Sequence, residues 1–261
     1  MKWHRIYGMI LRYMYHFKHS FDRISDAFYW PTLDLIMWGL TSVYAKSFMP
    51  QSSQIILVIL SGIIFWIIIW RGQYEITVNL LEELWNRNLV NIFSTPLKFS
   101  EWLISFILVG VVKAFLSFSF AIFMAYLLYK IKIFSFGFYM IPFIISLLLS
   151  GWWVGFLVAG VILRFGSKVQ TLAWTTVWIL GPFSAIYYPV SILPQWAKLI
   201  SSMLPMSYVF EGMREVIYKG HFDLSKLIIS FILNFVYLIL SIIFLRKSFD
   251  KVLEKGLVKV Y

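Results

Sequence analysis

The sequence predicts an all-α integral membrane protein, and three observations point to this fold class. Hydrophobic residues make up 61% of the 261 residues, whereas charged residues make up only 13%. Apolar runs recur at lengths close to the ~20 residues that a helix needs to cross a bilayer. The segments between these runs are polar or contain proline. Together these features exclude an ordinary soluble protein. They predict a single transmembrane domain, residues 1–261, with six transmembrane helices.

The first 26 residues predict an amphipathic helix that lies on the membrane surface. Apolar side chains such as Ile6, Met9 and Tyr13 recur at helical spacing, interleaved with basic side chains such as Arg5 and Arg12. In a helix of this kind, the apolar face enters the bilayer boundary and the basic residues reach the lipid headgroups. No uninterrupted apolar core of signal-peptide length is present, so a cleavable signal peptide is not expected.

Six apolar segments follow, and each is expected to cross the membrane. Spans 1 and 2 fall in residues 27–83, spans 3 to 5 in residues 101–185, and span 6 with a basic tail in residues 223–261. The second span is expected to continue as a more polar helix to near Glu83. The expected apolar cores are residues 31–44, 55–70, 102–128, 138–163, 169–185 and 224–245.

The distribution of Lys and Arg predicts the orientation of these spans. Roughly twice as many of the 23 Lys and Arg residues flank one side of the spans as the other, and the richer side is expected in the cytoplasm. Both termini lie on that side, which agrees with an even number of spans. Anionic lipid is the expected partner of the net charge of +11. Nucleic acid is not expected, because the basic residues do not gather on one folded face.

A polar stretch between the second and third spans, residues 81–100, is called the connector below. Its mixture of polar and apolar residues predicts a short amphipathic helix on the cytoplasmic side, stopped by Thr95 and Pro96. Such a helix either packs on the membrane surface or docks a cytoplasmic partner. Docking is favoured, because a purely solvated loop would not need its apolar residues. The candidate docking residues are Glu82, Glu83, Trp85, Asn86, Arg87 and Asn88.

Residues 186–222, on the external side, form a second unusual segment. The segment is too apolar for a soluble domain, and Pro189, Pro194 and Pro205 interrupt it. We expect two short helices that dip into the outer leaflet or lie on it, where protein or water must cover irregular backbone. Glu211 and Arg214 are the charged residues singled out in this segment.

A few polar residues fall in or beside the predicted spans. Asp34 is expected in the first turn of span 1, just after Pro31, where the helix dipole stabilises an acid; contact with a substrate is the alternative. Lys113, near the middle of span 3, either pairs with an acid or carbonyls as it reaches toward the cytoplasm, or lines a polar path. Arg71 and Glu75 are expected to form a local pair of little energetic value.

Other features predict packing rather than chemistry. Gly151, Gly155 and Ala159 are spaced four residues apart, which allows close helix packing, and Asn234 is expected to form an interhelical hydrogen bond. The chain has no cysteine, and its four histidines lack metal-ligand spacing, so no metal site is expected. No catalytic constellation and no GxxxxGK[ST] phosphate loop occur. An enzyme with its own ATP site is therefore not expected.

Three blocks in this order resemble a known family: the N-terminal amphipathic helix, residues 82–97 and residues 188–214. The chain is similar to the permease subunit of six-span type-2 ABC (ATP-binding cassette) exporters. The residues of its connector and first span resemble a multidrug-like branch of that family. In this resemblance the connector corresponds to the coupling helix that enters a groove on the ATPase. Residues 186–222 correspond to an external re-entrant segment before the last span.

The resemblance implies two ATPase subunits that bind ATP and Mg, and a second permease copy, with a homodimer expected and a heterodimer as the alternative. It also implies alternating access in the inner membrane of a prokaryote. The substrate would pass between the permeases along Phe65, Trp174 and Trp178, and Lys113 would join them if it lines a polar path. The expected cargo is amphiphilic or lipophilic, as in multidrug efflux. The alternatives are a lipid-linked polysaccharide or teichoic acid glycan, a membrane lipid-modifying enzyme, or a scaffold that translocates folded proteins.

Overall fold

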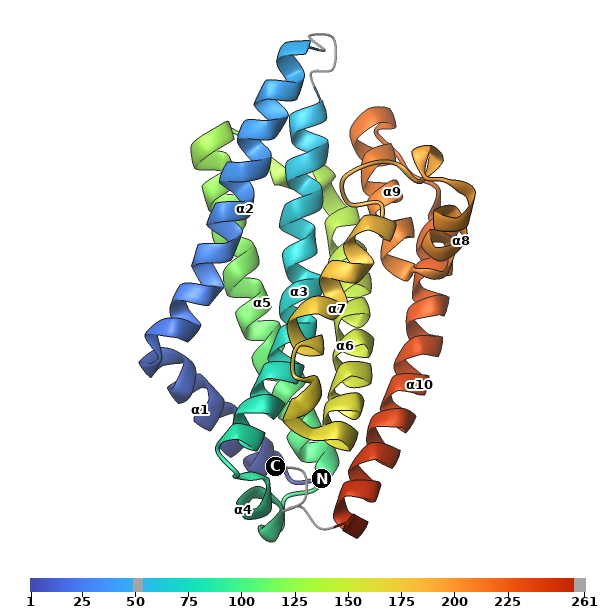
Figure 1. The fold of residues 1–261 in the computed structure, drawn as a ribbon. Helices are drawn as coiled ribbons and strands as arrows, with labels where there is room; N and C mark the ends of the chain where they lie inside the picture. The colour runs from blue at the N-terminus through green and yellow to red at the C-terminus, as the bar shows by residue number, and fades with distance from the viewer. Residues whose placement is uncertain (49–53, 256–261) are drawn as a thin grey trace.

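The computed structural model describes residues 1–48 and 54–255, and every element in this part of the chain is a helix (Figure 1). The longer helices are α1 (Trp3–His19), α2 (Phe21–Phe48), α3 (Ile55–Trp85), α5 (Phe99–Tyr129), α6 (Met140–Phe165), α9 (Pro205–Lys219) and α10 (Leu224–Lys255). The shorter ones are α4 (Leu89–Ser94), α7 (Leu172–Leu180), α8 (Gln195–Met203) and the 3-10 turns η1 (Ile133–Tyr139), η2 (Gly166–Val169), η3 (Gly181–Phe183) and η4 (Val190–Ile192).

Helix α3 forms the centre of the bundle. It packs against α2, α5, α6 and α7, and Figure 1 shows it running between them. Nearly every side chain between Leu60 and Leu84 is buried, as expected for a helix that is apolar on most sides. The helix continues without a break to Trp85, which confirms the predicted extension of the second span to near Glu83.

Four helical segments within residues 1–48 and 54–255 are long and apolar enough to cross a membrane: 55–85, 99–129, 136–169 and 224–254. These match the second, third, fourth and sixth predicted spans. The first predicted span lies within α2, which carries several charged side chains along its length. The fifth is divided between η2, α7 and η3, whose longest apolar stretch is Leu172–Phe183. The six-span count therefore stays a prediction.

The structure corrects the expected start of the first span. Residues 21–48 form one helix with Pro31 in its interior, so Asp34 does not lie in a first helical turn. A proline has no backbone N–H, and it leaves the carbonyl four residues earlier without its usual donor. Here Ser117 on α5 supplies the donor: its Oγ lies 3.0 Å from the Ala27 oxygen. The proline is accommodated because a neighbouring helix satisfies the freed carbonyl.

The predicted N-terminal helix is shorter than expected and packs on protein. Helix α1 ends at His19, and α2 begins at Phe21. The α1 residues Ile6 and Tyr13 are buried, and the helix contacts α5 and α2. Its first turn is fixed to α5, since the Lys2 backbone N–H donates to Glu101 Oε1 at 2.6 Å. Much of the apolar face of α1 thus serves as packing surface within the chain.

Small and polar residues bring α6 close to its neighbours, as predicted. Gly151 approaches α3 so closely that a Cβ atom there would lie 3.1 Å from the Gly72 Cα atom and 2.7 Å from the Ile69 oxygen. On the α10 side, Asn234 Nδ2 donates to the Ser146 oxygen at 3.0 Å, and Ser150 Oγ donates to Asn234 Oδ1 at 2.9 Å. Both expectations, close packing within the chain and an interhelical hydrogen bond, are confirmed.

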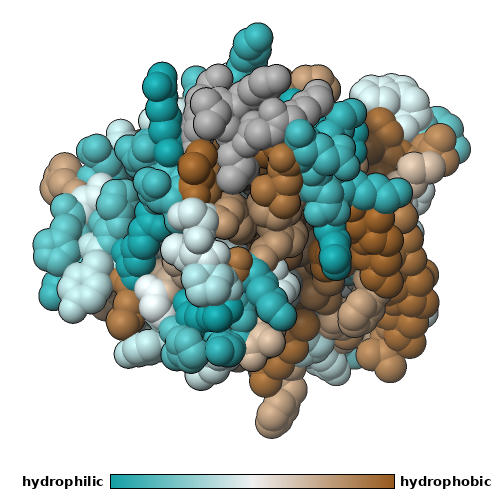
Figure 2. Space-filling model, turned by 90° about the horizontal axis from the view of Figure 1, so that it is seen from below, coloured by the Kyte–Doolittle hydropathy of each residue, from teal (hydrophilic) through white to brown (hydrophobic). Residues whose placement is uncertain are grey.

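The two ends of the bundle differ. Helix α4, the start of α1 and the last turns of α10 lie at one end, whereas α8 and α9 lie toward the other (Figure 1). Figure 2 looks onto the α4 end and shows hydrophilic side chains over much of this face, with hydrophobic ones gathered at one side. The connector is thus placed on a largely polar face of the molecule.

Candidate functional site

The connector is a helix end followed by a sharp turn and a second, short helix. Helix α3 ends at Trp85, and Arg87 adopts a left-handed conformation with φ of 51°. The Arg87 N–H bonds to the Leu84 oxygen and the Asn88 N–H to the Glu83 oxygen, at 2.9 and 2.8 Å. This is the Schellman pattern of helix termination, in which glycine usually occupies the left-handed position. The connector, residues 81–100, is therefore not one amphipathic helix as expected, although its short helix α4 does end at Ser94, before Thr95 and Pro96.

Glu83 is buried and ties the connector to α1. Its Oε1 accepts from the Tyr13 hydroxyl at 2.8 Å, and its Oε2 accepts from Arg12 Nη2 at 2.9 Å and from Asn88 Nδ2 at 2.7 Å. Burial, reinforced by the Glu83 carboxylate, raises the pKa of Tyr13 well above its ordinary value, so this hydroxyl acts as a neutral donor. Glu83 contributes to the position of the connector rather than to its exposed surface.

Glu82 has the same kind of role, with partners on both α1 and α2. Arg23, near the start of α2, donates its Nε to Glu82 Oε1 at 2.8 Å, and His16 Nδ1 lies 3.6 Å from Glu82 Oε2. The end of α3 is thus joined to both α1 and α2 by charged side chains. Any displacement of the connector must move these helices or break the pairs.

The outer surface of the connector is formed by other residues. Trp85, Asn86 and Arg87 are exposed, and Asn88 is half-buried. Exposed positions continue along α4 and beyond at Val90, Asn91, Ser94, Thr95, Pro96 and Lys98. The Trp85 ring stacks on Trp174 with centroids 6.4 Å apart, and its Nε1 donates to Gln170 Oε1 at 3.0 Å. Trp85 therefore links this surface to η2 and α7.

A buried network of charges lies further along α3. Lys113 Nζ on α5 lies 2.6 Å from Glu75 Oε2, and Arg71 Nη1 lies 3.8 Å from Glu75 Oε1. Arg71 Nη1 also pairs with Asp26 Oδ2 on α2, at 2.8 Å. Arg71, Glu75 and Lys113 are each about 2% exposed or less.

This network shows which of two expected roles Lys113 has, and it adds a closer partner for Arg71. Lys113 pairs with an acid, which was one of its two expected roles. Arg71 and Glu75 do form the expected i,i+4 pair, at 3.8 Å, but both side chains are buried and the closer partner of Arg71 is Asp26, at 2.8 Å. A buried charge that loses its partner is strongly destabilising.

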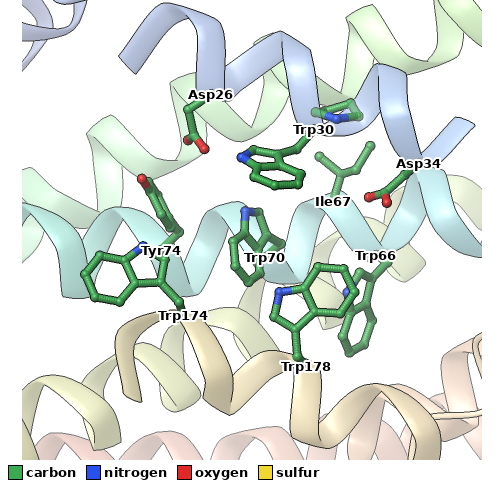
Figure 3. Close-up of a pocket in the computed structure, with 10 residues that line it drawn as sticks. Asp26, Trp30, Asp34, Trp66, Ile67, Trp70, Tyr74, Trp174 and Trp178 are labelled. Atoms are coloured by element: carbon green, nitrogen blue, oxygen red, sulfur yellow. The ribbon is translucent and has the colours of Figure 1, made fainter. Parts of the chain in front are cut away.

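Next to this network lies a cavity of about 270 Å³ between α2, α3 and α7, called the aromatic cavity below (Figure 3). Two carboxylates, Asp26 and Asp34, line it together with Pro31 and Ile67. The rest of its wall is aromatic: Trp30, Trp66, Trp70, Tyr74, Trp174 and Trp178. The Trp70 ring contacts Trp178, with centroids 5.7 Å apart.

The lining residues come from three helices at the same spacing. Asp26, Trp30 and Asp34 are spaced by four along α2, Trp66, Trp70 and Tyr74 along α3, and Trp174 and Trp178 along α7. Residues four apart lie on one face of a helix, and Figure 3 shows the three faces turned toward one another. The sequence predicts Trp174 and Trp178 as path residues and offers Asp34 as an alternative substrate contact, but it does not single out Asp26 or the aromatic residues of α2 and α3. The repeated spacing was the signal that could have found them.

Two other predicted path residues lie outside the cavity. The Phe65 ring is fully buried on a different side of α3, where it contacts Phe118 and Phe136. Lys113 is held by Glu75 and is not among the lining residues. Of the four residues proposed for the path, only Trp174 and Trp178 line this space.

Residues 186–222 contain two helices, α8 and α9, as predicted. Pro189 precedes η4, Pro194 caps α8 and Pro205 begins α9. Arg214 on α9 donates to the carbonyls of Ala185 and Ile186 and pairs with Glu211 at 3.2 Å. Glu211 Oε1 also accepts the Val190 N–H at 2.8 Å. These two charged residues hold the turn that follows η3 against α9.

Residues 1–48 and 54–255 contain no group of three His, Asp or Glu side chains arranged to hold a metal ion. The two carboxylates of the aromatic cavity do not converge either. They lie two helical turns apart on α2, or about 12 Å along the axis, and Arg71 pairs with Asp26. This arrangement is not that of a paired acid and base.

Comparison with models of known protein families gives a match over most of the chain. The model of a family described as "ABC-2 type transporter" matches residues 11–218, which is most of the chain and includes α2 to α9 almost entirely. No curated protein matches the chain. The matched region contains both the connector and the aromatic cavity.

Proposed function

Because this chain belongs to the ABC-2 type transporter family, and is thus a membrane permease component, we propose that it is the transmembrane subunit of an ATP-driven exporter. In this proposal it moves an amphiphilic or lipophilic substrate out across the cytoplasmic membrane. Two ATPase subunits hold ATP and Mg and bind the connector from the cytoplasm. A second permease copy completes the pathway, with both termini of each permease in the cytoplasm.

The observation that carries this proposal is the continuity of α3. One unbroken helix lines the aromatic cavity with Trp66, Trp70 and Tyr74 and then ends in the connector at Trp85. The distance from Trp70 to Trp85 along the helix is about 22 Å, at the usual rise per residue. A helix transmits an axial displacement as a rigid rod, so a push on the connector moves one wall of the cavity.

A second element supports the same coupling. Trp85 touches Gln170 and stacks on Trp174, which is itself a lining residue of the aromatic cavity. The connector therefore reaches two of the three helices that form the cavity. Glu82 and Glu83 add α1 and α2 through their ion pairs.

The test is capture of the ATPase through the exposed part of the connector. The tagged chain is purified from the membranes of its own host, and Mg-ATP hydrolysis of the eluate is measured. We expect an ATPase to co-purify with the wild-type chain and with Lys247→Ala, an exposed control in α10. Asn86→Glu and Arg87→Glu together should lose most of it while the permease stays folded. Full retention of a coupled ATPase by that double variant would contradict the proposal.

Glu83 is unsuitable for this test. It is buried among Tyr13, Arg12 and Asn88, so a charge reversal there would disturb the fold and not only the docking surface.

Export of a lipid-linked glycan is the alternative substrate class, since aromatic rings also stack on sugars. Transport assays with glycan-lipid and with small amphiphiles separate these two cargoes.

A further inference from the structure

Asp34 is the carboxylate of the aromatic cavity that has no side-chain partner among the described residues. Within the described part of the chain, it makes no ion pair and no side-chain hydrogen bond, whereas Asp26 pairs with Arg71 at 2.8 Å. A carboxylate in a largely apolar wall is costly unless a positive charge or donors compensate it. Asp34 is half-buried, and a cationic ligand in the cavity would supply the charge that the described residues do not.

The aromatic rings around Asp34 favour the same kind of ligand. The face of an indole ring attracts cations, and tryptophan is the strongest of the aromatic side chains in this respect. Figure 3 shows Trp66 on α3 at the level of Asp34, with Trp30, Trp70 and Trp178 grouped beside them. Trp30 and Trp178 are about half exposed, at 50% and 47%. Two of the rings are therefore incompletely covered by the chain.

One buried donor also lacks a partner. Trp66 is 6% exposed, and its indole N–H has no hydrogen-bond acceptor among the described residues. Buried N–H groups are normally satisfied. Because Trp66 lines the cavity, an acceptor atom on the body of a natural ligand would satisfy this donor, whereas the cationic group itself would contact the ring face.

We propose that the aromatic cavity binds a monovalent organic cation with a compact apolar or aromatic body. The ammonium group lies between Asp34 and Trp66, and the body lies against Trp70 and Trp178. This inference deepens the proposed function by naming the substrate class, and it rests on that function only for the statement that the ligand is cargo. The volume of about 270 Å³ fits a small organic cation or the charged end of a larger one.

The experiment measures binding to the purified chain without ATP or an ATPase. Radiolabelled benzyltrimethylammonium is the probe, and equilibrium dialysis gives its affinity. The competitors are the uncharged isostere neopentylbenzene, at measured free concentration, and the anion phenylmethanesulfonate. We expect the cation to bind at least about tenfold more tightly than either competitor, as ion pairing with cation–π contacts would give.

Two variants locate the ligand, each with a matched control. Asp34→Asn should weaken probe binding by about tenfold and Trp178→Leu by about fivefold. Asp22→Asn, an exposed position on the same helix, and Trp196→Leu, an exposed position on α8, should leave the affinity unchanged. Thermal unfolding of each variant verifies its fold. If Asp34→Asn fails to fold, the ligand series and Trp178→Leu decide the question.

Equal binding of the cation and the uncharged isostere would overturn the inference, as would unchanged affinity in folded Asp34→Asn.

Nanodiscs with and without phosphatidylcholine distinguish the sources of the cation. If phosphatidylcholine competes with the probe, a choline headgroup is an occupant of the cavity. If it does not compete, the occupant is a soluble cation. If the chain bound no cation but still supported ATP-coupled export, this inference would be refuted and the proposed function would stand. Cation binding by a chain with which no ATPase co-purifies from its host membranes would instead count against the proposed function.

Discussion

Lys113 Nζ lies 2.6 Å from Glu75 Oε2, and this pair joins α5 to the centre of α3 where both side chains are almost completely buried. Asn79 Nδ2 lies 3.4 Å from the same carboxylate oxygen, and Arg71 approaches the other oxygen. Each charge is therefore balanced inside the bundle. The network fixes the relative positions of α2, α3 and α5 around the aromatic cavity.

Breaking this pair on one side should be costly. Lys113→Met leaves Glu75 with only Arg71 and Asn79, so we expect a loss of about 3 to 5 kcal/mol in the free energy of unfolding. The double variant Lys113→Met with Glu75→Gln removes both charges and should recover part of this loss. Unfolding in mixed micelles with increasing SDS measures each variant. Additive losses in the double-mutant cycle would show that the two groups do not interact.

Ser117 and Pro31 give a second double-mutant cycle. In the wild type, Ser117 Oγ donates to the Ala27 carbonyl that Pro31 leaves without its helical donor. Ser117→Ala should therefore cost about 1 kcal/mol, as an unmatched buried acceptor does. In a Pro31→Ala background the restored N–H supplies the donor, and the same serine substitution should cost much less. An equal cost in both backgrounds would contradict this role.

Local residue patterns predicted the elements better than the contacts between them. The helices over 55–85, 99–129 and 224–255 follow from long apolar runs, and the small residues at 151 and 155 were expected at a close helix contact. Glu83 was assigned to an exposed surface because its partners, Arg12 and Tyr13, are about 70 residues away in the chain. No local pattern reveals such a pairing.

The same reason explains the error at Pro31. A proline followed by an acid three residues later is typical of a helix start, and only the distant Ser117 allows it to lie inside a helix. The aromatic cavity differs, because its spacing of four was present on all three helices. That pattern marks an aromatic face on α3 and α7 and a face with two acids and a tryptophan on α2, but it does not show that the three faces meet.

The contact between α3 and α6 is sensitive to a single methyl group. A Cβ at residue 151 would lie 2.7 Å from the Ile69 carbonyl oxygen, and backbone atoms cannot turn aside as a side chain can. Gly151→Ala should thus lower the free energy of unfolding by about 1 to 3 kcal/mol, the usual cost of overpacking. Gly8→Ala is the control, because a Cβ there meets nothing within 4 Å. It should be neutral or slightly stabilising, since alanine favours a helix. A similar loss at both positions would exclude close packing as the cause.

Substitutions of Arg87, the left-handed residue in the connector, distinguish an effect on folding from an effect on ATPase coupling. Arg87 holds a φ of 51° at the position where the Schellman motif favours glycine. Arg87→Gly and Arg87→Ala both remove the guanidinium, but only glycine adopts this conformation without strain. Arg87→Gly should be more stable than Arg87→Ala by about 1 kcal/mol, measured by SDS unfolding.

If the Arg87 side chain contacts the ATPase, both variants should lose affinity for it to the same extent despite their different stabilities. If only the turn geometry matters, Arg87→Gly should bind the ATPase like the wild type and Arg87→Ala less tightly. Co-purification and Mg-ATP hydrolysis, measured side by side on both variants, decide between these roles. Equal stability of the two variants would show that the backbone at residue 87 is not left-handed in the folded protein.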